Sequence, residues 1–248
     1  MDGALWYLKR FDLFERLTAS EAERLNRRAL IRPYKRHSLI YSPAEPGQSV
    51  LAVASGRVKI KDLTADGRET ILAFIEEGEL FGELALLDGR PRQEFAEAVE
   101  DSEIVAFPTD EVTRLMESRP DVALSVTKLI GLRRQRIESR LRNLLFLPSR
   151  ARLVHVLLEL AETHGDQSDN RSLIRIPLTH HDLAGLIGAS RETVTIVLGQ
   201  LQADRLVRME RKRILLPDLK KLREESRGGS PPLTGKVPRR LPPSLPPV

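Results

Sequence analysis

The stretch from Leu178 to Val207, LTHHDLAGLIGASRETVTIVLGQLQADRLV, decides the fold of this chain. It contains two segments with apolar residues at helical spacing, and a turn signal at Gly188 separates them. In the second segment, four apolar residues recur three, four and seven positions apart, which predicts one buried helix face. They are Val194, Val197, Leu198 and Leu201. A basic hairpin pattern, RLVRMERKRILLP, follows. Helix, tight turn, helix and basic hairpin form the sequence outline of a winged helix-turn-helix.

The opposite face of the second helix is the candidate surface for contact with DNA. Ser190 is placed as the N-cap, so Arg191 and Glu192 lie in the first turn, which enters the major groove in a recognition helix. Arginine can contact guanine O6 and N7, and glutamate can accept from cytosine N4. For Glu192 alone, complementing the helix dipole is a competing interpretation. The predicted DNA-binding residues are Thr179, Ser190, Arg191, Glu192, Thr193, Thr195, Ile196, Arg208, Arg211, Lys212 and Arg213.

Composition excludes several classes of protein. The chain has 248 residues, of which 41% are hydrophobic and 30% charged, as in globular proteins. No apolar run approaches the roughly 20 residues of a membrane helix, and the N-terminus lacks a secretory signal pattern, so we expect a cytoplasmic protein without a membrane partner. The absence of cysteine excludes disulfides, thiolate metal sites and cysteine-ligated iron–sulfur clusters. The five histidines are scattered, and we predict no metal site.

Charge is distributed unevenly along the chain. Residues 1–132 carry 18 basic and 23 acidic side chains, whereas residues 133–227 carry 19 basic and 12 acidic ones. A basic half is compatible with polyanion binding, although a solvated charged face is the simpler interpretation of charge alone.

The acidic half has the pattern of a small β-fold. Short apolar segments, SVLAVASG, GRVKIKDLT, ETILAFI and SEIVAFP, alternate with turn signals, which predicts a sandwich or barrel. A short helix precedes them, with Thr18 or Ser20 as its cap.

A long amphipathic helix is predicted from Pro120 to the residue before Pro148. Its narrow apolar stripe is too long for a small barrel to cover, so we predict a homodimer through this helix. The alternative is a helix that packs within its own chain. The predicted dimer residues are Val126, Ile130, Ile137, Leu141 and Leu144.

The remaining segments complete a predicted α+β organisation. Ser149 is the predicted cap of a helix that ends at Gly165, and a polar loop and a short strand, LIRIP, follow. We expect a β-roll over residues 11–118, a central helix over 119–147, a winged helix-turn-helix over 148–223 and a disordered, proline-rich tail over 224–248. Removal of the tail is expected to leave the selectivity for operator DNA unchanged.

The helix-turn-helix stretch, the segment GELFGELALLDGRPRQEFAEAVEDSEIVAF and the long helix together resemble the Crp/Fnr family of bacterial transcription regulators. The resemblance covers roughly Leu13 to Leu216, and SRETV is its most specific part. It implies an N-terminal β-roll like a cyclic-nucleotide-binding domain, a dimerising helix, binding to double-stranded DNA and contact with RNA polymerase.

The resemblance also implies an effector pocket, which departs from the family pattern. Gly82 and Glu83 match the pair that meets the ribose, and Arg92 matches the arginine that meets the cyclic phosphate. Gln93 replaces a serine, and Glu94 places a carboxylate near the expected phosphate. The implied effector residues are Gly82, Glu83, Leu84, Arg92, Gln93, Ile137 and Glu138.

Three interpretations of the β-roll remain open. It binds cyclic AMP weakly, it binds another anionic or nucleotide-like ligand, or it binds nothing and is locked in a form ready for DNA. A purely structural role for Glu83 and Arg92 would be an ion pair that holds the loop.

In the DNA-reading helix, the family's second arginine aligns with Ile196, which cannot donate to guanine but can touch a thymine methyl group.

Two rival functions explain less of the chain. A nucleotide-regulated module of a kinase or channel would not need the recognition helix or the basic hairpin. A cupin-like enzyme would need clustered metal ligands, and among the histidines His37 alone falls in the β-rich segment. The sequence therefore predicts a non-enzymatic regulator.

Overall fold

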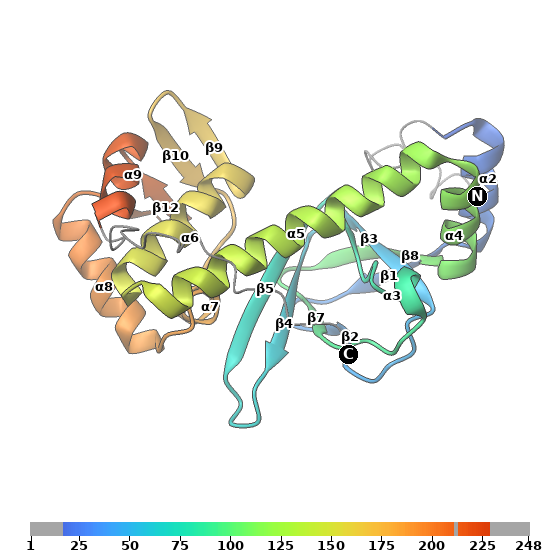
Figure 1. Ribbon diagram of the computed structural model, residues 1–248, viewed down its shortest axis with the longest axis horizontal. Coiled ribbons are helices and arrows are strands. Elements are labelled where there is room, and N and C mark those ends of the chain that lie inside the picture. Colours follow the sequence, from blue (N-terminus) through green and yellow to red (C-terminus); the bar gives the residue numbers. More distant parts are fainter. Residues whose placement is uncertain (1–16, 211–212, 229–248) are drawn as a thin grey trace, which may run out of the picture.

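The computed structural model describes residues 17–210 and 213–228, which form two lobes joined by one long helix (Figure 1). The first lobe consists mainly of strands, and the second consists of helices with one small sheet, so the predicted α+β architecture is confirmed. Of the predicted disordered tail, residues 224–228 are helical, as part of α9, and the remaining residues lie outside the described ones. Among the described residues, no helix is long and apolar enough to cross a membrane.

The first lobe is a β-roll of two four-stranded sheets. The sheet orders are β1-β8-β3-β6 and β2-β7-β4-β5, and every strand pair is antiparallel. The strands are β1 (Leu30–Tyr34), β2 (Leu39–Tyr41), β3 (Ser49–Ser55), β4 (Arg57–Leu63), β5 (Glu69–Glu76), β6 (Leu80–Phe81), β7 (Phe95–Ala98) and β8 (Ser102–Pro108). The predictions of β3, β4, β5 and β8 are confirmed, whereas the other four strands were not predicted.

Three helices pack against the strands β3 and β8 of the roll. They are α2 (Ala19–Arg28), α3 (Ala85–Asp88) and α4 (Thr109–Ser118). Thr18 is the N-cap of α2 and forms a capping box with Glu21, which confirms the first of the two predicted caps. The helix α5 (Pro120–Phe146) follows directly, with proline in its first turn, and it ends before Pro148 as predicted.

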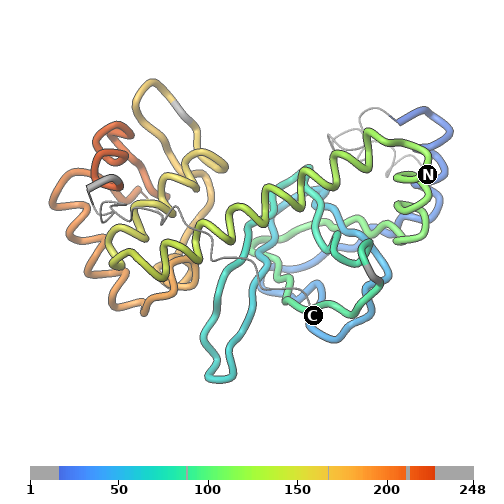
Figure 2. The backbone as a smooth tube through the Cα atoms, viewed as in Figure 1, coloured from blue at the N-terminus to red at the C-terminus, as the bar shows by residue number. Residues whose placement is uncertain are grey.

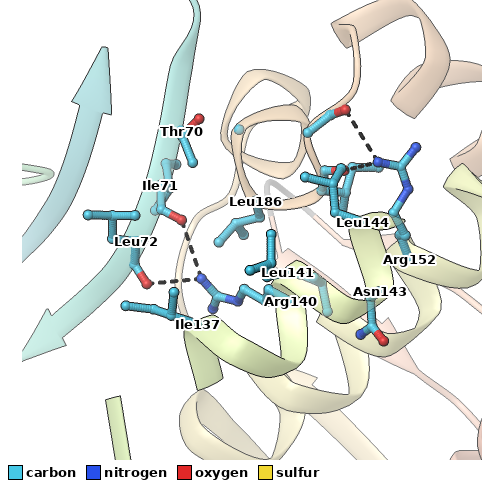
Figure 3. A pocket seen from close by; sticks show the side chains of 14 residues that line it. Thr70, Ile71, Leu72, Ile137, Arg140, Leu141, Asn143, Leu144, Arg152 and Leu186 are labelled. Carbon is cyan, nitrogen blue, oxygen red and sulfur yellow. Dashed lines mark hydrogen bonds between the residues drawn. The ribbon is translucent and has the colours of Figure 1, made fainter. Parts of the chain in front are cut away.

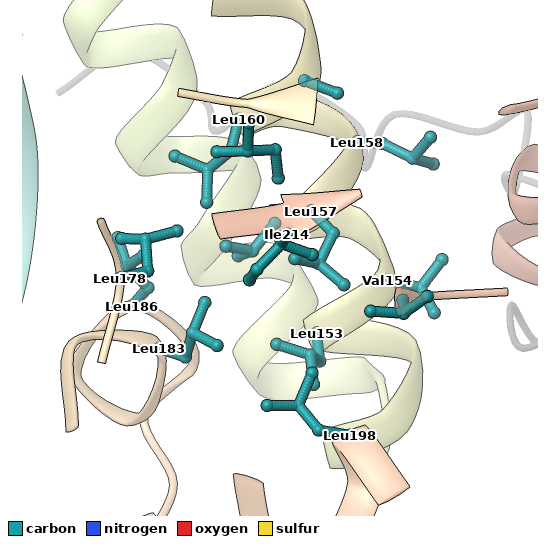
Figure 4. Packing of buried hydrophobic residues seen from close by; sticks show 14 of the residues in the cluster. Leu153, Val154, Leu157, Leu158, Leu160, Leu178, Leu183, Leu186, Leu198 and Ile214 are labelled. Atoms are coloured by element: carbon teal, nitrogen blue, oxygen red, sulfur yellow. The ribbon is translucent and has the colours of Figure 1, made fainter. Parts of the chain in front are cut away.

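The second lobe contains the predicted helix pair and hairpin. Its elements are α6 (Ser149–His164), β9 (Gly165–Ser168), β10 (Arg171–Ile174), α7 (His180–Ile187), α8 (Arg191–Ala203), β11 (Arg208–Glu210), β12 (Arg213–Leu216) and α9 (Leu219–Gly228). Apolar side chains of α6, α7, α8 and β12 form its core (Figure 4). α9 was not predicted.

Two local predictions in this lobe are wrong. Ser149 does not cap α6, because Pro148 occupies the N-cap position and Ser149 is the first helical residue. The polar segment after Gly165 is not a loop, because it pairs as β9 with β10 in a hairpin that turns at Asp169, where φ is +51°. Polar residues are tolerated in these two strands because one face of the hairpin is largely exposed to solvent.

The two lobes touch along β5 and α7 as well as through α5 (Figure 2). Gly185 in α7 has no side chain at this contact, and a Cβ there would lie 3.1 Å from the Glu69 carbonyl oxygen and 3.3 Å from Ile71. The second lobe is therefore packed directly on the β4–β5 hairpin.

Candidate functional site: a recognition helix and an internal cavity

The second helix of the helix-turn-helix presents the predicted polar face. Ser190 is its N-cap, and its hydroxyl accepts from the Thr193 backbone N–H at 3.2 Å. Arg191 and Glu192 are exposed in the first turn. Ile196 is 63% exposed, so it is not a core residue. The predicted apolar stripe, Val194, Val197, Leu198 and Leu201, is buried.

Two groups on this face are fixed by local contacts. The Thr195 hydroxyl donates to the Arg191 carbonyl at 2.9 Å and lies 2.8 Å from His180 Nδ1 of α7. Backbone N–H and Ser190 hydroxyl contacts, with the charge of Arg191, lower the pKa of Glu192 below its usual range. At neutral pH Glu192 is therefore an ionised hydrogen-bond acceptor.

The other described candidates for DNA contact lie at the start of α7 and on the strands β11 and β12. Thr179 is the N-cap of α7 and forms the predicted capping box with Asp182. Arg208 is exposed and lies 3.6 Å from Glu210, and Arg213 is exposed on the neighbouring strand. Arg211 and Lys212, which follow β11 in the sequence, lie outside the described residues.

A cavity of about 370 Å³ lies where the β-roll, α5 and α6 meet. Its walls are mainly apolar, with Phe74 and Phe81 from the roll and Leu160 from α6. Five of the predicted effector residues line it: Gly82, Glu83, Leu84, Ile137 and Glu138. Arg92 and Gln93 do not; they line a separate, smaller cavity of about 160 Å³. The predicted effector residues are therefore spread over two cavities, and Leu84 lines both.

The suggested ion pair between Glu83 and Arg92 is wrong. Glu83 accepts from Arg133 of α5 at 2.7 Å, and both side chains are nearly buried. Arg92 donates to the Gly82 carbonyl at 2.7 Å and to the Ser49 carbonyl at 2.5 Å. Sequence reasoning missed Arg133, because on a long charged helix it resembles any solvated arginine.

The Arg92 guanidinium is also held by an aromatic ring. It stacks on Tyr41, with 4.5 Å between its Cζ atom and the ring centroid. The Tyr41 hydroxyl donates to Glu94 at 3.0 Å, and burial, reinforced by the Glu94 charge, raises the pKa of Tyr41 above its usual range. Glu94 itself lines both cavities.

A second arginine of α5 joins the lobes (Figure 3). Arg140 donates to Glu159 of α6 through two nitrogens, at 2.7 and 3.1 Å. It also donates to the carbonyls of Leu72 at 3.0 Å and Ile71 at 3.3 Å, both in β5. One guanidinium therefore connects α5, α6 and the β-roll.

Buried charges tie the β4–β5 hairpin to α7. Lys59 lies 2.9 Å from Glu69 and 3.8 Å from Asp182, the capping residue of α7. Lys61 lies 2.8 Å from Glu69 and also contacts Glu97. Burial acts to raise the pKa of Glu69, but hydrogen bonds from Lys61 and Lys59 outweigh it and leave that pKa below its usual range.

This network predicts a loss of stability in acid. A carboxyl whose folded pKa is depressed stabilises the fold above its unfolded pKa, and that contribution disappears as pH falls through the folded pKa. We expect the free energy of unfolding to decline below about pH 4.5. Urea titrations between pH 7 and pH 3 measure this, and Glu69→Gln should show a shallower decline. An identical decline in both proteins would exclude Glu69 as a contributor.

The predicted dimer residues do not share one environment. Val126 is 2% exposed and is therefore covered by its own chain, which removes it from the surface available to a partner. Ile130 is half-buried and lines the larger cavity. Ile137, Leu141 and Leu144 are exposed and border a cavity of about 190 Å³ between α5, α7 and β5.

These features define a class of protein: a sensor-type β-roll coupled by a long helix to a winged helix-turn-helix. Two family models match the chain, a cyclic nucleotide-binding domain over residues 31–119 and a Crp-like helix-turn-helix domain over residues 151–225. The "Cyclic AMP receptor protein" of Thermus thermophilus is 35% identical over 178 residues, which are 72% of this chain and 79% of that protein. The chain belongs to the Crp/Fnr family of transcription regulators.

One further relative and two solved structures are also similar to this chain. A "CRP-like cAMP-activated global transcriptional regulator" of Mycobacterium tuberculosis is 28% identical over 220 residues, 89% of this chain and 98% of that one. A CRP/FNR family regulator from Thermus thermophilus superposes with a TM-score of 0.63 at 29% identity, covering 81% of this chain and 100% of the other. FixK2 from Bradyrhizobium japonicum has the same fold, with a TM-score of 0.70 at 23% identity, covering 79% and 96%.

Proposed function

We propose that this transcription regulator binds double-stranded DNA as a homodimer, with α8 of each protomer in the major groove. The observation that carries the proposal is the division of α8 into two faces. Its apolar stripe is buried in the lobe, whereas Arg191, Glu192 and Ile196 are exposed beyond a capped N-terminus.

The side chains on α8 predict the half-site. Arg191 suits guanine and Glu192 suits cytosine N4, while Ile196 offers an apolar contact to a thymine methyl group. We therefore expect an operator that keeps part of the family's half-site and is relaxed, or favours T, where Ile196 reaches.

Arg191→Ala is expected to weaken operator binding by about 1–3 kcal/mol and to relax one base position, because the bidentate contact is lost. Arg213→Ala should weaken binding to all sequences similarly, because we assign it to phosphate. Fluorescence anisotropy on operator and scrambled DNA separates the two effects. Equal losses on both DNAs for Arg191→Ala would refute its role in base reading.

The dimer is supported by the exposed apolar residues of α5, which include Leu124 and Leu132 as well as Leu141. We expect sedimentation to show a dimer at micromolar concentration and Leu141→Glu to shift it toward monomer, because a charge cannot be buried in such a contact. Leu39→Glu, at an exposed leucine of β2, is the matched control. A monomeric wild-type protein would contradict the proposal.

Of the three interpretations of the β-roll, the geometry favours a protein that is ready for DNA without a cyclic nucleotide. Arg92 is held on backbone carbonyls, and Glu94 adds negative charge close to it. Cyclic AMP, the ligand in the names of several relatives, would have to displace these contacts. RNA polymerase is the partner that the role of a transcription regulator implies, and the cytoplasm is where it would meet bacterial DNA.

A further inference from the structure

A cavity of about 540 Å³ opens beside β1 and β2, the strands at the edges of the two sheets of the β-roll. Residues of β1, β2, β3 and β8 line it, and its volume is in the range of small-molecule sites. β2 has only three residues, and four of the five residues of β1 are exposed. The inner face of the first sheet is therefore uncovered at its edge. We call this space the edge cavity.

The floor of the edge cavity is apolar, but β1 places an arginine on it. Leu51 of β3 and Ile104 of β8 are buried in the floor. Because side chains alternate along a strand, Leu30, Arg32 and Tyr34 share one face of β1, and all three line the cavity. Arg32 pairs with Ile104 in the β1–β8 register. An inner-face position that is ordinarily apolar thus carries a guanidinium.

The Arg32 charge has no counterion in the chain. Among the residues that the structure describes, Arg32 forms no ion pair or hydrogen bond. Two carboxylates lie on the rim of the edge cavity, and both are engaged elsewhere. Asp110 accepts from Arg28 at 2.5 Å, and Glu45 accepts from the Ser42 backbone N–H at 2.9 Å and from its hydroxyl at 2.7 Å. The cavity therefore presents a guanidinium that is available to an anion.

The buried end of the edge cavity adds a second positive charge. Arg92 is 8% exposed, and it donates to the carbonyls of Gly82 and Ser49, which are dipoles and do not neutralise its charge. Its guanidinium stacks on Tyr41, which lines both the edge cavity and the larger cavity. A buried positive charge beside an apolar wall favours an anion in the same space.

We propose that the edge cavity binds a small amphipathic carboxylate, with its head group on Arg32 and its apolar body against Leu51 and Ile104. A carboxylate matches the fork of a guanidinium, and the floor buries the body of the ligand. The site is separate from the larger cavity, because Arg92 is the one predicted effector residue that lines it. The inference goes beyond the proposed function and does not depend on DNA.

The test uses the full chain and octanoate as the probe. Octanamide is the neutral analogue, and acetate is the head group alone. Isothermal titration calorimetry measures their affinities for the wild type, for Arg32→Gln and for Arg36→Gln, an exposed arginine just after β1 that does not line the edge cavity. Circular dichroism verifies that each variant is folded. Octanoate is then titrated again in the presence of cyclic AMP.

Octanoate is expected to bind the wild type at least about tenfold more tightly than octanamide or acetate, because one lacks the charge and the other the apolar body. Arg32→Gln should weaken octanoate binding by about tenfold, since a charge-assisted hydrogen bond is lost. Arg36→Gln should match the wild type. Cyclic AMP should leave the octanoate affinity unchanged, because the larger cavity does not include Arg32.

Equal octanoate affinities of the wild type and Arg32→Gln would overturn the inference, and Arg32 would then serve to protect the edge strand from pairing with another chain. Displacement of octanoate by cyclic AMP would also overturn it. Leu30→Glu gives a second reading, because Leu30 is exposed at the cavity and a carboxylate there repels an anion. If Arg32→Gln does not fold, unchanged octanoate binding by Leu30→Glu counts against the inference.

Discussion

Leu157→Ala is expected to lower the free energy of unfolding of the DNA-binding lobe by about 2–5 kcal/mol. Leu157 is fully buried at the centre of the apolar cluster that joins α6 to α7, α8 and β12. Removing its side chain loses the transfer free energy of the buried methyl groups, and the surrounding residues close the resulting cavity incompletely. The recognition helix depends on this core, because its own apolar stripe packs there.

Urea unfolding monitored together with hydrogen exchange of the α6 and α8 amides measures this effect. Ile196→Ala is the matched control, because Ile196 is exposed on the same lobe. The control should change stability by less than about 0.5 kcal/mol while altering the base preference of the operator. A small loss for Leu157→Ala, similar to that of the control, would mean that α6 is not the centre of this core.

Arg140→Met has the second-largest expected effect, a loss of about 2–3 kcal/mol in the coupling between lobes. The substitution keeps the apolar stem but leaves Glu159 without its partner and the two β5 carbonyls without a donor. The expected result is a DNA-binding lobe that moves independently of the β-roll, since the β5 side of the contact between lobes is weakened.

Hydrogen exchange of the β5 and α7 amides gives the readout, because both lie at the contact between lobes. We expect faster exchange in Arg140→Met and unchanged exchange in Arg142→Met, an exposed arginine on the same helix. Unchanged exchange in both variants would show that Arg140 does not hold the lobes together.

The recognition helix could be predicted from the sequence because its signals are local. The N-cap at Ser190, the apolar stripe beginning at Val194 and the left-handed turn at Gly188 all lie within a few residues of one another. Periodicity alone separates the buried face from the exposed one. The exposure of Ile196 follows from the same pattern.

The contacts of the cavity could not be predicted, because they join residues far apart in the sequence. Arg133 and Glu83 are 50 positions apart, and Arg140 and Leu72 are 68 apart. On α5, these arginines have the same sequence environment as exposed ones such as Arg142. The strand β6, with two residues, is likewise too short to give a periodic signal.

We propose that this chain reads DNA as a symmetric dimer through α8. Selection from random DNA by the wild-type protein, followed by footprinting, measures whether it does. We expect a near-palindrome, with half-sites about 10 base pairs apart and a guanine contact in each that is lost in Arg191→Ala. Binding without sequence preference, or a single unrepeated half-site protected by a monomer, would contradict it.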